Sequence, residues 1–187
     1  PEGKGTEYSY QQENKLIGYF GRLNYNYKEK YMLSASIRHE GSSKFGDNHK
    51  WGNFPAVSVA WNIKKENFLK NYNSISILKL RAGWGVTGTE PSSPYQSLNT
   101  LNLSRYAYYN GSWMKTNFLG SNANADLEWE KKAEFNVGLD WGFFSDRLSG
   151  TIDLYNRKTT NLIWDYTVAV PPYPYSNMTA NAGTIRN

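Results

Sequence analysis

Four acidic residues in one stretch have a spacing that acid–base chemistry could use. They are Glu128, Glu130, Glu134 and Asp140. Even spacing would place their carboxylates on one face of an extended strand, where a pair could act as general acid and base. The strand expected beside this one carries Lys79 and Arg81 on its polar face, and ion pairs between the strands account for the carboxylates more simply. Since no pair of carboxylates stands apart from the others, we predict an ionic network and no catalytic residue.

Two further patterns carry little chemical information. His39 and His49 flank one polar segment, but two histidines without a fixed third ligand are weak evidence for a metal site. Residues 83–88 read Gly-Trp-Gly-Val-Thr-Gly, which has the glycine spacing of dinucleotide-binding loops. Pro91 and Pro94 follow and prevent the helix whose N-terminus would hold a pyrophosphate. We therefore predict neither a metal nor a cofactor.

Aromatic residues gather in the longest polar segment of the chain. They are Tyr106, Tyr108, Tyr109 and Trp113. Exposed aromatic rings bind sugars and flat apolar ligands, and aromatic clusters also mark protein interfaces. The alternative is that these rings pack on one another as a small core of their own loop. Both interpretations are open, and the four residues are our candidates for contact with a ligand or a partner.

Composition limits the class of protein. The chain has 187 residues with 39% hydrophobic residues, and its apolar surface is carried by 15 Tyr, 8 Phe and 7 Trp. That aromatic content argues against disorder. No run approaches the roughly 18 apolar residues of a membrane helix, although the alternating strands of a membrane β-barrel would also average out as hydrophilic. The absence of cysteine excludes disulfides, and the scattered charges that give a net +5 argue against nucleic-acid binding.

Alternation of apolar and polar residues predicts about six antiparallel, up-and-down strands. They cover 16–27, 31–38, 55–63, 78–86, 129–143 and 148–155. Connections at one end are the turns 28–30 and 145–146 and the longer segment 64–77, in which 66–69 could form one helical turn. Connections at the other end are the long loops 39–54, 87–127 and 159 onward. Residues 1–14 are expected to be loop, and the start of the chain lacks a signal-peptide pattern.

The two sets of connections suggest a transmembrane β-barrel, which has short turns at one end and long loops at the other. The aromatic residues would form a girdle at each membrane interface. The girdle at the short-turn end comprises Tyr25, Tyr27, Tyr31, Trp61, Trp141, Phe143 and Phe144, and that at the long-loop end comprises Trp84 and Trp129. The alternative is a soluble β-sandwich carbohydrate-binding module with shorter strands and a second sheet packed on the first.

Several motifs resemble the barrel half of SusC/RagA-type TonB-dependent outer-membrane transporters, and they follow one another in the same order. The most specific are Arg38-His-Glu-Gly-Ser-Ser-Lys-Phe-Gly46 and Gly52-Asn-Phe-Pro-Ala-Val-Ser-Val-Ala-Trp61. Others are Phe20-Gly-Arg-Leu-Asn-Tyr-Asn-Tyr-Lys-Glu-Lys-Tyr-Met-Leu33, Leu78-Lys-Leu-Arg-Ala-Gly-Trp-Gly-Val-Thr-Gly88, Leu127-Glu-Trp-Glu-Lys131, Asn136-Val-Gly-Leu-Asp140 and Gly150-Thr-Ile-Asp-Leu-Tyr155. The resemblance covers most of the chain.

The resemblance implies that residues 1–187 are part of a β-barrel in the outer membrane, without the plug and without the end of the barrel. It implies import of oligosaccharides or peptides, driven by a TonB complex through the absent plug. It also implies a SusD-like surface lipoprotein over the long loops 39–54 and 87–127, contact of the wall with outer-membrane lipid, and no enzymatic activity.

Overall fold

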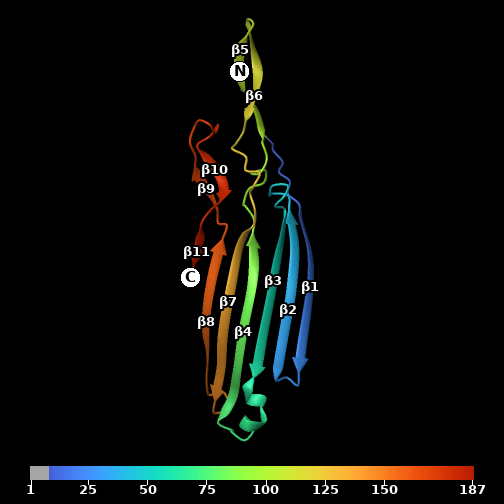
Figure 1. Ribbon diagram of the computed structural model, residues 1–187, viewed down its shortest axis with the longest axis vertical. Coiled ribbons are helices and arrows are strands. Elements are labelled where there is room, and N and C mark those ends of the chain that lie inside the picture. Colours follow the sequence, from blue (N-terminus) through green and yellow to red (C-terminus); the bar gives the residue numbers. More distant parts are fainter. Residues whose placement is uncertain (1–8) are drawn as a thin grey trace, which may run out of the picture.

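The computed structural model describes residues 9–187 (Figure 1). The first eight residues, which belong to the predicted N-terminal loop 1–14, lie outside the described residues. Regular structure in the described part is almost entirely β-strand, with two short 3-10 helices, η1 (Ile63–Lys65) and η2 (Asn67–Leu69). Among these residues, no helix has the length and apolar character needed to cross a membrane. The helical turn predicted at 66–69 is confirmed as η2, which Glu66 precedes.

Seven of the described strands form one antiparallel sheet in the order β1-β2-β3-β4-β7-β8-β11. Their bounds are β1 (Leu16–Tyr27), β2 (Tyr31–Ser42), β3 (Trp51–Asn62), β4 (Ile75–Thr89), β7 (Glu130–Phe143), β8 (Leu148–Thr160) and β11 (Thr184–Arg186). Two hairpins, β5–β6 (Leu101–Tyr109, Ser112–Leu119) and β9–β10 (Ile163–Thr167, Asn177–Asn181), lie beyond one end of the sheet in Figure 1. The six long strands confirm the predicted antiparallel, up-and-down arrangement, and the sheet is open.

The long strands of the sheet exceed what a soluble fold usually contains. β1, β2 and β3 have 12 residues each and β4 has 15, whereas soluble strands are commonly about 5–6 residues long. The other two described sheets are only the two-stranded hairpins. The β-sandwich alternative is therefore wrong, because the described residues contain no second broad sheet and the strands are too long.

Strand register gives the sheet two unlike faces. Leu23, Ala35, Val57, Trp84 and Phe135 are consecutive partners across five strands, so they lie in one row on one face. The next row, on the opposite face, runs through Arg22, Ser36, Ala56, Gly85 and Glu134. The apolar face is largely exposed, since Leu23, Val57, Trp84 and Phe135 are each at least 41% accessible. Large apolar side chains in contact with solvent indicate a surface that another medium or molecule covers.

Aromatic rings line the apolar face at the short-turn end, as predicted. The Tyr31 ring stacks against Tyr27 and Trp61, with centroids 6.5 and 6.4 Å apart. Trp141 and Phe143 lie 5.8 Å apart further along the same end. The turn of β1 into β2 that holds Tyr27 beside Tyr31 has positive φ at Lys28 and Glu29, the backbone shape that matches strand twist in tight hairpins.

The long-loop end is more regular than predicted. The loop predicted at 39–54 is shortened to 43–50, because Glu40 pairs with Gly52 and Gly41 pairs with Trp51, which extends β2 and β3. The loop predicted at 87–127 contains the end of β4 and the whole β5–β6 hairpin, and the segment from 159 onward contains β9, β10 and β11. These strands were missed because both of their faces are polar or mixed, so they lack the alternation that marks a strand with one apolar face.

Candidate functional site

The four aromatic candidates lie at the tip of the β5–β6 hairpin, which projects beyond the sheet (Figure 1). Tyr108 pairs with Trp113, and their rings meet edge to face with centroids 5.4 Å apart. Tyr106 precedes Tyr108 by two residues along β5, so its side chain lies on the same face of the hairpin, opposite Lys115. Tyr109 pairs with Ser112 and lies on the opposite face. The structure thus brings three of the four together and separates Tyr109 from them.

These aromatic side chains are among the most exposed in the described chain. Tyr106, Tyr108, Tyr109 and Trp113 are 58%, 63%, 72% and 70% accessible. One ring contact between Tyr108 and Trp113 does not make a loop core. The hairpin instead presents aromatic rings on both faces, together with the cations Arg105 and Lys115 and no carboxylate between residues 91 and 125.

The turn of this hairpin has a clear sequence signal. Asn110 and Gly111 have φ of 48° and 82°, and they connect the pair Tyr109 and Ser112. Asn-Gly is the preferred dipeptide for a two-residue turn in which both residues have positive φ. That dipeptide, with an alternating pattern on each side of it, could have revealed the hairpin.

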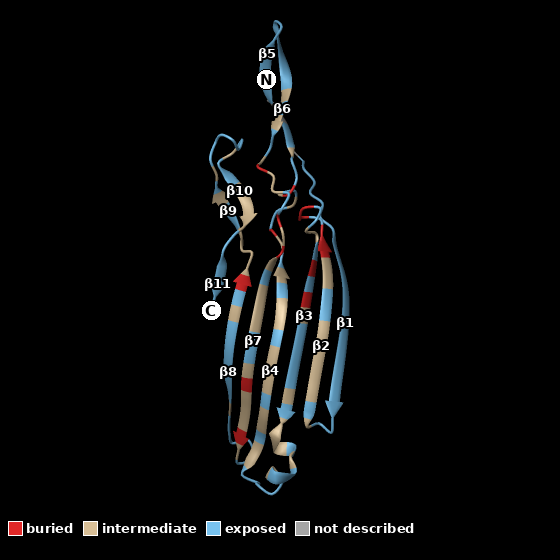
Figure 2. Ribbon diagram, viewed as in Figure 1, coloured by how far each residue is buried: buried red, intermediate tan, exposed pale blue. Residues whose placement is uncertain are grey.

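A small core at the long-loop end forms the base of the hairpin. It consists of Phe45, Phe54, Leu127 and Trp129, and most buried segments in Figure 2 lie here, where strands give way to loops. The Trp129 ring lies 4.7 Å from Phe45 and 5.2 Å from Phe54, and its indole N–H donates to the Lys50 carbonyl at 3.0 Å. Trp129 is only 3% exposed, so its assignment to an interfacial girdle is wrong. It follows the loop directly and packs inside this core.

A buried ion pair ties two loops to this base. Lys44 Nζ lies 2.8 Å from Glu90 Oε1 and donates to the Pro91 carbonyl at 2.9 Å. The Ser42 hydroxyl donates to the other carboxylate oxygen of Glu90 at 2.7 Å. Lys44 is 8% exposed, so this lysine is satisfied by protein groups rather than by water.

Asparagine side chains join the hairpin base to the β9–β10 hairpin. Asn122 donates to the carbonyls of Tyr175 and Asn177 at 2.6 and 2.9 Å and accepts from the Tyr175 amide. Asn181 donates to the Glu128 carbonyl and accepts from the Glu128 amide, both at 2.8 Å. The β5–β6 hairpin therefore rises from a base that hydrogen bonds hold in place.

The acidic stretch behaves as an ionic network. Arg81 Nε lies 3.1 Å from Asp140 Oδ2, and its other arm reaches Asp153 Oδ1 at 2.9 Å, which confirms the predicted pair between β4 and β7. Glu134 pairs with Arg157 on β8 at 2.6 Å. Glu128, which precedes β7, accepts a hydrogen bond from Asn161 in the β8–β9 connection. Glu130, which begins β7, accepts one from the amide of Ile163, the first residue of β9.

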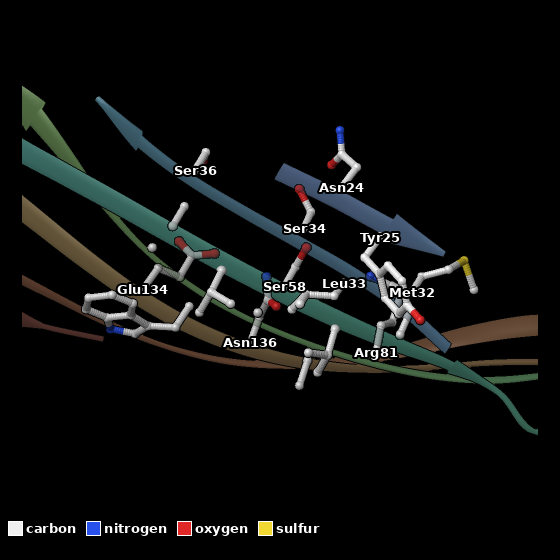
Figure 3. A pocket seen from close by; sticks show the side chains of 18 of the residues that line it. Asn24, Tyr25, Met32, Leu33, Ser34, Ser36, Ser58, Arg81, Glu134 and Asn136 are labelled. Atoms are coloured by element: carbon white, nitrogen blue, oxygen red, sulfur yellow. The ribbon is translucent and has the colours of Figure 1, made fainter. Parts of the chain in front are cut away.

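Beside this network the polar face is hollowed by small residues. A shallow hollow of about 780 Å³ has Ser34, Ser36, Ser58, Gly83 and Gly85 among its lining residues. Figure 3 shows the Ser34 and Ser58 side chains between Asn24 and Asn136. The three glycines of the 83–88 motif all lie inside β4, so the motif is a strand and not a phosphate-binding loop.

The histidines are structural in this arrangement. The His39 ring stacks on Trp51 with centroids 4.6 Å apart, and its Nδ1 lies 2.7 Å from Asn53 Oδ1. His49 belongs to the 43–50 loop, where its amide donates to the Gly46 carbonyl. Within residues 9–187, no group of three or more acidic or histidine side chains could hold a metal ion.

An open sheet of long strands, apolar on one exposed face and ionic on the other, with its long loops at one end, defines a section of the wall of an outer-membrane β-barrel. The family described as "TonB dependent receptor-like, beta-barrel" matches residues 1–187. The chain belongs to this family, and it is of the SusC/RagA type. Members of this class lie in the outer membrane.

Individual relatives support that assignment. The chain is 38% identical to the TonB-dependent receptor SusC of Bacteroides thetaiotaomicron over 96% of its own length and 18% of that protein. It is 39% identical to the TonB-dependent receptor P39 of Formosa agariphila, over 92% of this chain and 16% of that protein. It therefore spans less than a fifth of these curated relatives.

Comparison with solved structures supports the same family assignment. The structure of the RagAB peptide transporter superposes with a TM-score of 0.82 at 26% identity, over 92% of this chain and 19% of that chain. The siderophore receptor PirA from Pseudomonas aeruginosa matches with a TM-score of 0.60 at 17% identity, over 92% of this chain and 29% of that chain, which shows a common fold.

Proposed function

We propose that this chain forms a section of barrel wall in an outer-membrane transporter that imports oligosaccharides or peptides. The observation that carries the proposal is the division of one sheet into an exposed apolar face and an ionic face across six long strands. A wall between lipid and a hydrated lumen needs this division, since charges on the lipid face are destabilising.

The two faces have separate roles in this proposal. The row through Leu23, Val57 and Phe135 contacts lipid, and the tyrosines and tryptophans at the short-turn end lie at the membrane interface. The face with Arg81, Asp140 and Glu134 lines the lumen, where ion pairs remain hydrated. The relatives are receptors and transporters by name, which supports a transport role rather than an enzymatic one.

The long-loop end faces the outside and carries the contacts with partner and cargo. We propose that a SusD-like surface lipoprotein covers loop 43–50 and the β5–β6 hairpin, and that a TonB complex acts through a plug outside this chain. The hairpin supports this role because Tyr106, Tyr108 and Trp113 are exposed on a fixed base. The peptide alternative for the cargo is supported by the RagAB peptide transporter, and the oligosaccharide alternative rests on the resemblance of the sequence motifs to SusC/RagA-type transporters.

Variants of the hairpin in the full-length transporter test this proposal. Trp113→Ala and Tyr109→Ala should each weaken association with the surface lipoprotein or uptake of a labelled oligosaccharide or peptide mixture, because each removes an exposed ring. Barrel assembly, read as heat-resistant migration in detergent gels, should be unchanged. Because the two residues lie on opposite faces, the pair also tells which face makes the contact.

Trp164→Ala is the matched control, since Trp164 is a tryptophan of the same 70% exposure on β9 at the same end of the sheet. Unchanged association and unchanged uptake in both hairpin variants would refute a role for the hairpin. An equal loss in the Trp164 variant would show that the contact extends over the whole end.

A further inference from the structure

The connection between β3 and β4 is longer than the other short-turn connections, and its shape is fixed. Residues 63–72 fold into η1, η2 and a following turn, in which amide hydrogen bonds link Glu66 to Ile63, Leu69 to Glu66 and Tyr72 to Leu69. Lys64 Nζ crosses the segment and donates to the Leu69 and Tyr72 carbonyls at 3.2 and 2.9 Å. We call residues 63–72 the foot, and Figure 1 shows it beyond the end of β3 and beside the start of β4.

One carboxylate fixes the foot to the apolar side of the sheet. Glu66 accepts hydrogen bonds from the Tyr31 hydroxyl at 2.7 Å, the Trp61 indole at 3.1 Å and Lys30 Nζ at 2.9 Å. Tyr31 and Trp61 are partners in the apolar row that continues to Leu80. The foot is therefore held beneath the aromatic girdle, on the side that the proposed function assigns to lipid.

The foot presents aromatic rings that this chain does not cover. Phe68 and Tyr72 are 63% and 61% exposed, and they contribute nothing to the buried core of the described residues. Phe144 in the neighbouring turn is 61% exposed as well. Aromatic side chains that lie among polar residues are concentrated at the boundary between hydrocarbon and water.

The same end of the sheet is basic. The segments 28–30, 63–74 and 144–147 hold six cations (Lys28, Lys30, Lys64, Lys65, Lys70, Arg147) and three carboxylates (Glu29, Glu66, Asp146). Two of the carboxylates are already engaged, Glu66 with Lys30 and Glu29 with Lys65. Lys28, Lys70 and Arg147 have no carboxylate partner among the described residues, so the surface carries positive charge toward whatever lies below the girdle.

We propose that the foot binds anionic phospholipid headgroups of the leaflet at the short-turn end, with Phe68 and Tyr72 inserted among the headgroups and Lys70 beside their phosphates. The inference rests on the proposed function. Membrane lipid, rather than an acidic protein, is the expected ligand because the foot continues the lipid-facing wall. Its Glu66 is hydrogen-bonded to Tyr31 and Trp61, which belong to the aromatic girdle at the membrane interface. Basic residues beside exposed aromatic rings are the combination that anchors proteins to anionic lipid surfaces.

Site-directed spin labelling of the full-length transporter tests the depth of the foot. Phe68→Cys and Tyr72→Cys are made on a cysteine-free background and labelled after reconstitution into vesicles of phosphatidylglycerol and phosphatidylcholine. Labels at both positions should be more accessible to dissolved oxygen than to a water-soluble nickel complex. Asp47→Cys, in the exposed loop 43–50, provides the aqueous reference.

Val59→Cys, on the apolar face of β3, separates the two hypotheses. If the label at position 59 is lipid-accessible while those at 68 and 72 match the aqueous reference, the proposal for the foot is overturned and the wall assignment stands. If the label at position 59 is itself aqueous, the proposed function fails.

A charge substitution tests the preference for anionic lipid. Lys70→Gln should reduce the association of spin-labelled phosphatidylglycerol with the transporter by about fivefold relative to phosphatidylcholine, the effect of one lysine at an anionic surface. Lys115→Gln, at the distant β5–β6 hairpin, is the matched control. Equal selectivity in the unsubstituted protein and the Lys70 variant would overturn the assignment of Lys70 to the phosphates.

Discussion

Glu66 accepts hydrogen bonds from three side chains, and this sets its response to acid. The Tyr31 hydroxyl, followed by Lys30 and the Trp61 indole, lowers the pKa of Glu66 from 4.5 to about 2. The folded carboxyl binds a proton less readily than the unfolded one, so its stabilising contribution is complete above pH 4.5. It is lost as pH falls through about 2.

We expect hydrogen exchange in residues 66–72, after correction for intrinsic rates, to be slow above pH 4.5 and to become faster as pH falls from 4.5 towards about 2. Glu66→Gln should raise exchange of the same amides at neutral pH, because an amide replaces a charged acceptor and presents only one oxygen. Exchange in the distant β5–β6 hairpin, which has no contact with Glu66, is the internal reference. A variant with unchanged protection would show that the carboxylate does not hold the foot.

Glu90 is the second single side chain whose loss should be costly, because its carboxylate balances the buried charge of Lys44. Glu90→Gln leaves the buried ammonium without its counter-charge, which should weaken the local stability of the long-loop core by about 3 kcal/mol. The double variant Lys44→Met with Glu90→Gln should recover much of that loss, because no unpaired charge then remains. Exchange protection of the Ser42 and Gly46 amides, which bond to the Lys50 and Leu127 carbonyls, reports the effect. Equal loss in both variants would contradict this account.

At the scale of elements, the β5–β6 hairpin depends on its turn. Gly111 has a φ of 82°, a backbone conformation that costs an alanine about 1 kcal/mol, so Gly111→Ala should destabilise the hairpin by that amount. The cost is conformational and not steric, because a Cβ at this position would meet no atom within 4 Å. The expected result is weaker lid or cargo binding with normal barrel assembly. The control variant Asn110→Gly keeps the turn type and should bind the lid or the cargo normally. Normal binding by Gly111→Ala would argue against a role for a rigid hairpin tip.

The wall strands could be predicted from sequence and the loops only in part. Alternation marks β1, β4 and β8 because one of their faces is apolar and the other is polar, and family motifs reinforce it. The same test fails for β5 and β6, because apolar and polar residues are mixed on both of their faces. The role of Trp129 also escaped prediction, because a tryptophan beside a strand looks the same in sequence whether it contacts lipid or fills a loop core.

At the scale of the whole molecule, the matched relatives are several times longer than this chain. We expect an antibody against the β5–β6 hairpin to detect, in fractionated source cells, an outer-membrane band several times heavier than 21.4 kDa. Detection on intact cells would place the hairpin outside, because an antibody does not cross the outer membrane. A soluble band near 21.4 kDa would refute the assignment as barrel wall.

Burial of Trp129 also provides an intrinsic optical reporter. Of the seven tryptophans, Trp51, Trp113 and Trp164 are exposed at the loop end, and Trp61, Trp84 and Trp141 lie on the apolar face. Trp129 is enclosed by Phe45, Phe54 and Leu127. Acrylamide should quench the emission of the first group and brominated lipid that of the second, while Trp129 fluoresces under both. Any event that loosens the loops around this ring would then appear as a fluorescence signal without an added label.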